Sequence, residues 1–132
     1  MIARCVVESG TSSFYSAIRD ACEEPVLKEI AGRIAAGTGA LMVVNHAGNW
    51  DHAGAWACLR YGGLTTVAER LKPEGLYQRF AAYRESLGME IVPTGEPDIV
   101  RTLARRLNEG RLVPLMGDRD IGRNGVTVDL FG

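Results

Sequence analysis

The sequence predicts an α/β fold in which a mostly parallel sheet is flanked by helices. Short apolar runs alternate along the chain with segments whose apolar residues recur every three or four positions. Strands that alternate with helices imply crossover connections, and such connections join parallel strands. The chain has 132 residues, of which 46% are hydrophobic, so it is long enough to bury a core within one domain.

Four short apolar runs have the length and composition of buried strands. They are Ala40–Val44, Leu64–Ala68, Met89–Pro93 and Leu112–Met116. A further run, Val126–Leu130, alternates apolar and polar residues in the manner of a half-exposed strand.

Helical patterns fill the segments between these runs. The first covers Ser12–Ala36, and Pro25 is expected to divide it because proline lacks a backbone N–H. Glycines end several of the later patterns. These later helices are expected at Trp50–Tyr61, Pro73–Leu87 and Asp98–Glu109.

The chain reads as one partial domain. Residues 1–36 form an N-terminal helical part, and residues 37–132 form a core of alternating strands and helices. Because the sequence stops directly after a strand-like run, we expect the domain to be incomplete at both ends.

Composition disfavours several classes of protein. The formal net charge of −1 argues against a nucleic-acid-binding protein, which normally carries a basic excess. The cysteines Cys5, Cys22 and Cys58 show no CxxC spacing, so neither a disulfide framework nor a zinc site is indicated. No stretch reaches the roughly 20 apolar residues that a membrane-spanning helix needs. If a membrane is involved, this piece lies on it or is tethered to it.

Polar residues follow two of the predicted strands. The loop at residues 45–51 comes directly after the first strand, and the loop at residues 117–120 comes directly after the fourth. Functional groups of parallel sheets gather at the carboxyl ends of the strands, so both loops are candidate sites.

His46 is the strongest catalytic candidate in the first loop. Histidine titrates near neutrality and can take a proton from a hydroxyl if a carboxylate orients it, and Asp51 is placed to do so. Gly48 permits a tight turn, and Asn49 is a suitable N-cap for the following helix. The first backbone N–H groups of that helix can hold an oxyanion or a phosphate. The alternative is a loop histidine that only caps or packs.

Metal binding and covalent catalysis are less favoured. His46, Asp51 and His52 are possible ligands, but adjacent helical residues point about 100° apart and do not converge easily on one ion. The sequence has no Gly-x-Ser-x-Gly motif, and Cys58 lies within an apolar helix. His46 would therefore activate a substrate hydroxyl directly.

Charged residues at the same edge of the sheet are candidate binding groups. Arginines suit phosphate or carboxylate groups, and carboxylates can bind sugar hydroxyls or hold the arginines. The set comprises Glu69, Arg70, Asp118, Arg119, Asp120 and Arg123. Solvated turns that pair their own charges are the alternative. Trp50 either packs in the core or lines an acyl groove.

Two motifs together resemble a known family. The segment His46-Ala-Gly-Asn-Trp-Asp51 resembles the His-x4-Asp/Glu motif of glycerolipid acyltransferases, within the branch of lipid A late acyltransferases and phosphatidylinositol mannoside acyltransferases. Gly117–Asp120, with Gly122 and a strand at residues 126–131, resembles the second signature of that branch. The resemblance covers roughly residues 36–132. Lipid A members typically have glutamine where this chain has Arg119, so the chain looks closer to the phosphatidylinositol mannoside enzymes.

The resemblance implies transfer of a fatty acyl group from acyl-CoA or acyl carrier protein to a sugar hydroxyl of a membrane glycolipid. His46 would be the general base and Asp51 its orienting partner, with no metal and no cofactor. The substrate-binding residues would be Asn49, Trp50, Glu69, Arg70, Asp118, Arg119, Asp120 and Arg123. The protein would lie peripherally on the cytoplasmic face of the bacterial plasma membrane.

Other functions remain open at this stage. A lipid A-type acyltransferase, a thioester hydrolase and a non-catalytic membrane-binding fragment are the alternatives. Family members are considerably longer than this chain, so the resemblance implies that the piece alone is inactive.

Overall fold

The computed structural model describes residues 25–46 and 48–118. Its elements, in chain order, are α3 (Pro25–Ala35), β1 (Ala40–Val44), α4 (Trp50–Tyr61), β2 (Leu64–Ala68), α5 (Glu74–Ser86), β3 (Met89–Pro93), α6 (Ile99–Asn108) and β4 (Leu112–Met116). The predicted α/β fold is confirmed, and the four predicted strands have the predicted bounds. The expected helix before Pro25 and the expected strand at residues 126–130 lie outside the described residues.

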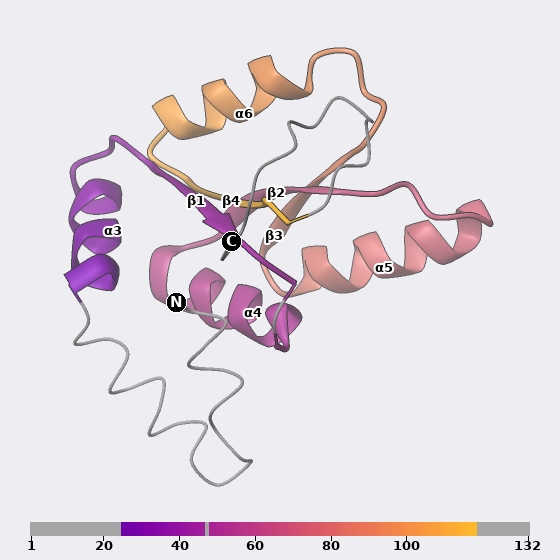
Figure 1. Cartoon of the computed structure of the whole chain (residues 1–132), viewed down its shortest axis with the longest axis horizontal. Coiled ribbons are helices and arrows are strands. Elements are labelled where there is room, and N and C mark those ends of the chain that lie inside the picture. The colour runs from indigo at the N-terminus through magenta and orange to yellow at the C-terminus, as the bar shows by residue number, and fades with distance from the viewer. Residues whose placement is uncertain (1–24, 47, 119–132) are drawn as a thin grey trace, which may run out of the picture.

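The strand order places the two polar loops side by side. The four strands form one sheet in the order β1-β4-β2-β3, and each described pairing is parallel (Figure 1). In the register of β1 and β4, Val44 lies opposite Met116. Two residues beyond that pair come His46 on one strand and Asp118 on the other, so these residues leave the sheet at the same point.

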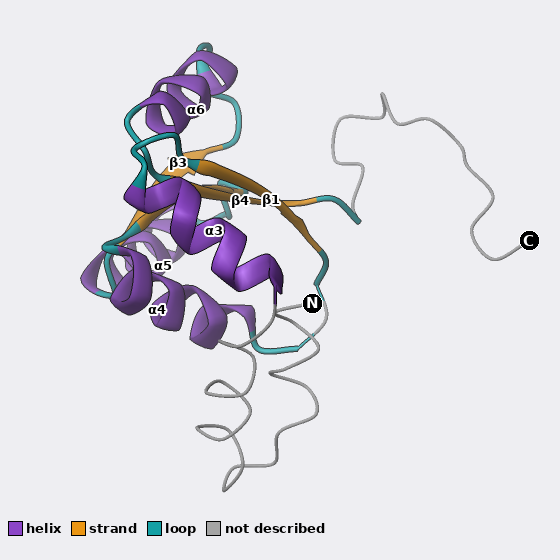
Figure 2. Cartoon of the chain, turned by 90° about the vertical axis from the view of Figure 1, so that its left-hand side faces the viewer, coloured by secondary structure: helices purple, strands orange, loops and turns teal. Residues whose placement is uncertain are grey.

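Helices cover both faces of the sheet. Figure 2 shows α3, α4 and α5 on one face and α6 on the other. Leu27 and Ile30 of α3 and Ala57 of α4 pack against the first residues of the strands, among them Leu112. The next residue of β4, Val113, points to the opposite face and packs with Leu103 of α6. In the described part of the chain, no helix is long and apolar enough to cross a membrane.

An ionic cluster fastens α6 to its face of the sheet. The Nε of Arg106 donates a hydrogen bond of 2.7 Å to Oε2 of Glu90 in β3, and Thr65 of β2 donates to the same oxygen at 2.7 Å. The guanidinium also contacts Glu109 at the end of the helix, at 2.8 Å. The guanidinium of Arg106 lowers the pKa of Glu90, so the carboxylate stays charged in this partly buried position.

Candidate active site

His46 and Asp118 form the central contact of the site. The ring Nδ1 of His46 lies 2.8 Å from Oδ1 of Asp118, and the backbone N–H of His46 donates to Oδ2 at 2.9 Å. These two hydrogen bonds, the backbone one foremost, lower the pKa of the Asp118 carboxyl. An ionised carboxylate at Nδ1 favours the tautomer with its proton on that atom, which leaves the Nε2 lone pair available as a base.

Asp51 lies in the first turn of α4 and has a different partner. Its Oδ1 accepts a hydrogen bond of 2.9 Å from Nε of Arg84 in α5. Among the described residues, the carboxylate in contact with the His46 ring is therefore that of Asp118, and Asp51 fastens α4 to α5. We expected Asp51 to orient His46 directly, and its role in catalysis stays a prediction. The long sequence separation of His46 and Asp118, 72 residues, hid their contact from analysis along the chain.

Arg84 connects Asp51 with the aromatic residue beside His46. Its side chain is only 12% exposed, and the guanidinium lies over the ring of Trp50 at 4.2 Å from the ring centroid. The rings of Trp50 and His46 meet edge to face, with centroids 6.3 Å apart. A guanidinium that both pairs with a carboxylate and stacks on an indole fixes the start of α4, and with it the loop that carries His46.

The start of α4 is capped as the sequence predicts. The side chain of Asn49 accepts a hydrogen bond of 3.1 Å from the backbone N–H of His52. Gly48 has a φ of 88°, a conformation that residues with a side chain rarely adopt. The amide oxygen of Asn49 is engaged in this cap. Its predicted contact with substrate is untested.

Glu69 and Arg70 follow β2 at the same edge of the sheet. Arg70 donates to both carboxylate oxygens of Glu74, at 2.9 and 3.0 Å, and its backbone N–H donates to Thr94. The guanidinium lowers the pKa of the Glu74 carboxyl. Arg70 is thus an exposed, internally paired charge in this structure, and its predicted contact with substrate is untested.

The second loop is described only up to Asp118. The predicted binding residues Arg119, Asp120 and Arg123 lie outside the described residues. Within residues 25–46 and 48–118, no three His, Cys, Asp or Glu side chains gather where they would hold a metal ion.

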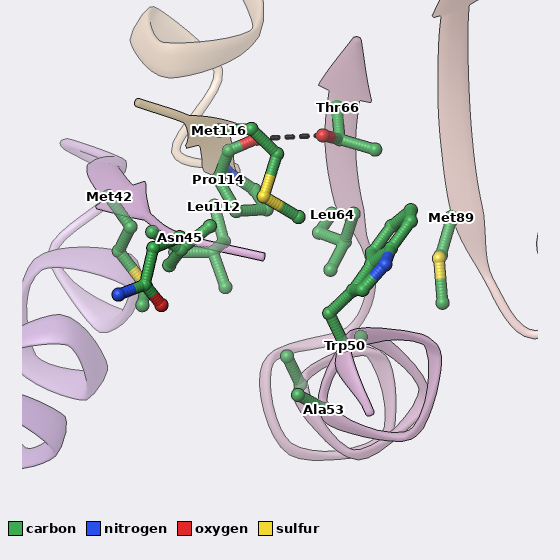
Figure 3. A pocket seen from close by; sticks show the side chains of 13 residues that line it. Met42, Asn45, Trp50, Ala53, Leu64, Thr66, Met89, Leu112, Pro114 and Met116 are labelled. Carbon is green, nitrogen blue, oxygen red and sulfur yellow. Dashed lines mark hydrogen bonds between the residues drawn. The ribbon is translucent and has the colours of Figure 1, made fainter. Parts of the chain in front are cut away.

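An apolar cavity opens beside this edge, between α4 and the sheet (Figure 3). It runs from Val44 and Met116, the last residues of β1 and β4, to the first residues of β2, β3 and β4. Its lining residues are almost all apolar: Met42, Val44, Asn45, Trp50, Ala53, Gly54, Ala57, Leu64, Thr66, Met89, Leu112, Pro114 and Met116. The hydroxyl of Thr66 donates to the carbonyl of Pro114 at 2.7 Å, and the other polar side-chain groups of the wall are the amide of Asn45 and the indole N–H of Trp50. The cavity has a volume of about 60 Å³, so in this structure it has room for only a few methylene groups of an alkyl chain.

Sequence patterns give little sign of this cavity. They left Trp50 either in the core or in an acyl groove, and the structure places it in the cavity wall. The remaining lining residues have the apolar periodicity of an ordinary core, so the pattern does not separate a filled interior from a hollow one.

Comparisons with known proteins agree with the predicted resemblance. The sequence model of a family described as bacterial lipid A biosynthesis acyltransferase matches residues 10–132. A phosphatidylinositol mannoside acyltransferase of Mycobacterium tuberculosis (strain ATCC 25618 / H37Rv) is 53% identical over 108 residues, which are 80% of this chain and 34% of that protein. A protein with the same description from Mycolicibacterium smegmatis is 54% identical over 99 residues, which are 74% of this chain and 33% of that protein. The chain thus spans about a third of the length of the curated relatives it matches.

Proposed function

Because the chain belongs to the bacterial lipid A biosynthesis acyltransferase family, we propose that it supplies the catalytic site of an enzyme that transfers a fatty acyl group to a hydroxyl of a membrane glycolipid. The relatives described as phosphatidylinositol mannoside acyltransferases favour a mannose hydroxyl of such a lipid as the acceptor. The observation that carries the proposal is the contact between His46 and Asp118 beside an apolar cavity.

His46 is the general base of the proposed reaction. Its Nε2 takes the proton of the acceptor hydroxyl while the hydroxyl oxygen bonds to the carbonyl carbon of an acyl thioester. Asp118 holds the proton on Nδ1 and stabilises the imidazolium that forms. The carbon–sulfur bond then breaks, and the departing thiolate receives the proton from Nε2. No protein nucleophile is needed, since the acceptor attacks directly.

The start of α4 supports the same step. The oxyanion of the tetrahedral intermediate lies within reach of the first backbone N–H groups of the helix, near Gly48 and Trp50, in our proposal. The contacts of Arg84 with Asp51 and Trp50 hold those donors in place before substrate binds. Fixed donors cost no reorganisation when negative charge develops.

The apolar cavity is the proposed site of the first methylene groups of the acyl chain, next to the reacting carbonyl. Each methylene that leaves water there contributes about 0.8 kcal/mol to binding. The donor is acyl-CoA or acyl carrier protein, and the charged headgroups of donor and acceptor bind to residues at the polar edge. Those residues are Asn49, Glu69, Arg70, Arg119, Asp120 and Arg123. The enzyme works peripherally at the cytoplasmic face of the bacterial plasma membrane in this proposal.

The test uses the complete polypeptide that carries this sequence, radiolabelled palmitoyl-CoA and an extract of membrane glycolipids. We expect label in a mannosylated phosphoinositide with the wild type, and a loss of about 10²- to 10⁴-fold with His46→Ala. His52→Ala is the matched control, because this histidine is exposed and the substitution keeps the backbone N–H that it donates to the Asn49 cap.

Three outcomes would contradict the proposal. Full activity of His46→Ala would exclude His46 as the base. Label released only as free fatty acid would indicate a thioester hydrolase with the same base. No turnover with any acceptor would favour a non-catalytic membrane-binding protein.

A further inference from the structure

One stripe of α5 is both apolar and exposed. Leu76, Phe80 and Tyr83 recur at intervals of four and three residues, so they lie within an arc of about 60° on the helix. They are 41%, 41% and 53% exposed. The half-buried residues of α5 lie on a different stripe, at positions 77, 81 and 84. The described part of the chain therefore leaves the apolar stripe largely uncovered.

Cationic side chains border this stripe, and the acidic side chains of α5 lie away from it. Arg79 lies about 40° around the helix from Tyr83, and Lys72 precedes α5 in the loop that leaves the polar edge. Both cations are exposed, and in the described part of the chain no carboxylate pairs with either. Glu74 and Glu85 lie about 120° or more from each apolar residue of the stripe. An apolar surface with a cationic border has the composition of a contact with anionic lipid headgroups.

The stripe adjoins the candidate active site. The guanidinium carbon of Arg84 lies 5.7 Å from the ring centroid of Phe80 and 4.2 Å from that of Trp50, whose ring meets His46 edge to face. In Figure 1, this end of α5 lies next to the start of α4, and the other end extends away from α4. A lipid held against the stripe would therefore have its headgroup close to His46.

We propose that the apolar stripe of α5, with Lys72 and Arg79, rests on a bilayer of anionic phospholipids and presents the glycolipid acceptor to His46. The acceptor in this inference rests on the proposed function, whereas the contact with the bilayer does not depend on catalysis. Three side chains that are each about half exposed offer far less than the roughly 800 Å² per partner of a stable protein interface. A bilayer is the better occupant, because an anionic leaflet also attracts the two cations.

The test measures binding of the complete polypeptide to vesicles of phosphatidylcholine that contain phosphatidylglycerol, beside vesicles of phosphatidylcholine alone. Leu76→Gln/Tyr83→Gln keeps good helix formers and should weaken binding to both kinds of vesicle by about tenfold or more. Lys72→Gln/Arg79→Gln should weaken binding to the anionic vesicles alone, by about 25-fold, since each cation near an anionic leaflet contributes about fivefold. Unchanged unfolding temperatures would show that these variants of exposed residues are folded.

Val100→Gln/Arg105→Gln is the matched control on α6, which covers the other face of the sheet. Val100 is 81% exposed and Arg105 is also exposed, so this variant removes one apolar and one cationic side chain from the surface. It should bind both kinds of vesicle as the wild type does. The inference is wrong if the α5 variants bind as tightly as the wild type, or if the α6 variant weakens binding as much. Self-association that the α5 variants abolish, without vesicle binding, would assign the stripe to a second copy of the chain and overturn it as well.

The physical state of the acceptor separates this inference from the proposed function. With a glycolipid acceptor dispersed in detergent, both α5 variants should transfer acyl groups at the rate of the wild type. With the same acceptor in anionic vesicles, their rates should fall with their binding. Vesicle binding through α5 by a protein that transfers no acyl group would uphold the surface and contradict the proposed reaction. Undiminished transfer to the acceptor in vesicles by both α5 variants would overturn the surface and leave the reaction standing.

Discussion

Two carboxylates with similar exposure have different partners, one on the face of the sheet that α6 covers and one at the polar edge. Glu90, on the side of α6, is 31% exposed, and Asp118, at the polar edge, is 37% exposed. Glu90 is held by the guanidinium of Arg106, which stays charged at any ordinary pH. Asp118 is held by the ring Nδ1 and the backbone N–H of His46. The two carboxylates therefore differ in the chemistry of their partner rather than in burial: the one proposed to act in catalysis pairs with an imidazole, and the other pairs with a guanidinium.

The two faces of the sheet also differ in how closely their side chains pack. On the side of α6, Val92, Leu103 and Val113 form a packed cluster. On the side of α4, a small apolar cavity lies between the helix and the sheet, and Asn45, which precedes His46, is part of its wall. Variants of the first region should thus change stability, and variants of the second should change activity.

The largest effect is expected at Asp118. Asp118→Asn keeps the shape of the side chain but removes the charge that stabilises the imidazolium, and the amide can hold the wrong tautomer of His46. We expect kcat to fall on the order of 10³- to 10⁴-fold with little change in unfolding temperature, because the contact is exposed. Steady-state kinetics and thermal unfolding of the same preparation measure both. A loss of less than about tenfold would mean that another group, such as Asp51, orients His46.

A smaller loss is expected from Arg84→Met. Methionine keeps the apolar packing against Trp50 but removes the hydrogen bond to Asp51 and the charge over the indole. A slight displacement of the start of α4 should lower kcat by about 10²-fold and leave KM for the acyl donor nearly unchanged. A purely structural role would instead lower the unfolding temperature and leave kcat of the folded enzyme intact.

A double-mutant cycle identifies the pathway of this effect. If Arg84 acts through Asp51, the double variant Asp51→Asn/Arg84→Met should lose little more activity than the larger single loss. Additive losses would show that the two side chains act independently.

Sequence patterns predicted the strands and helices because each element is short, regular and bounded by glycine or proline. The five-residue apolar run Ala40–Val44 is too short for a typical helix and follows a glycine, which favours a strand. The sequence patterns did not predict the order of the strands in the sheet, and that order determines which side chains meet at the candidate site. Only the adjacency of β1 and β4 brings Asp118 to His46, whereas the spacing along the chain pointed to Asp51.

The remaining features of the candidate site depend on side-chain packing between elements, which sequence patterns do not reveal. Arg84 lies in a largely polar helix, and nothing in the local sequence indicates that its guanidinium is buried against Trp50. The same holds for Gly54, where a Cβ atom would lie 2.6 Å from Cε of Met89, a contact that the local sequence does not indicate. Such pairs depend on how α4 and α5 lie on the sheet, which periodicity does not determine.

The smallest effect is expected from Glu90→Gln, and it should appear in stability alone. The variant loses the charge-assisted hydrogen bonds to Arg106, at a cost of about 1.5 to 3 kcal/mol in the free energy of unfolding. Glu109→Gln is the matched control, since it contacts the same guanidinium from a position that is 46% exposed and should cost less than about 1 kcal/mol. Urea unfolding at neutral pH measures both, and kcat should not change.

The difference in unfolding free energy between the wild type and Glu90→Gln should depend on pH if it has an electrostatic origin. Arg106 lowers the pKa of Glu90 in the folded state from its ordinary value of 4.5, so the unfolded chain binds the proton more readily. The stabilisation that the charged Glu90 carboxylate provides is therefore complete above about pH 4.5. It is lost as pH falls through the lower pKa of Glu90 in the folded state. We expect the stability gap between wild type and Glu90→Gln to be constant near neutrality and to shrink in acid. A gap that stays constant throughout would mean that packing of the side chain, rather than its charge, fastens α6 to the sheet.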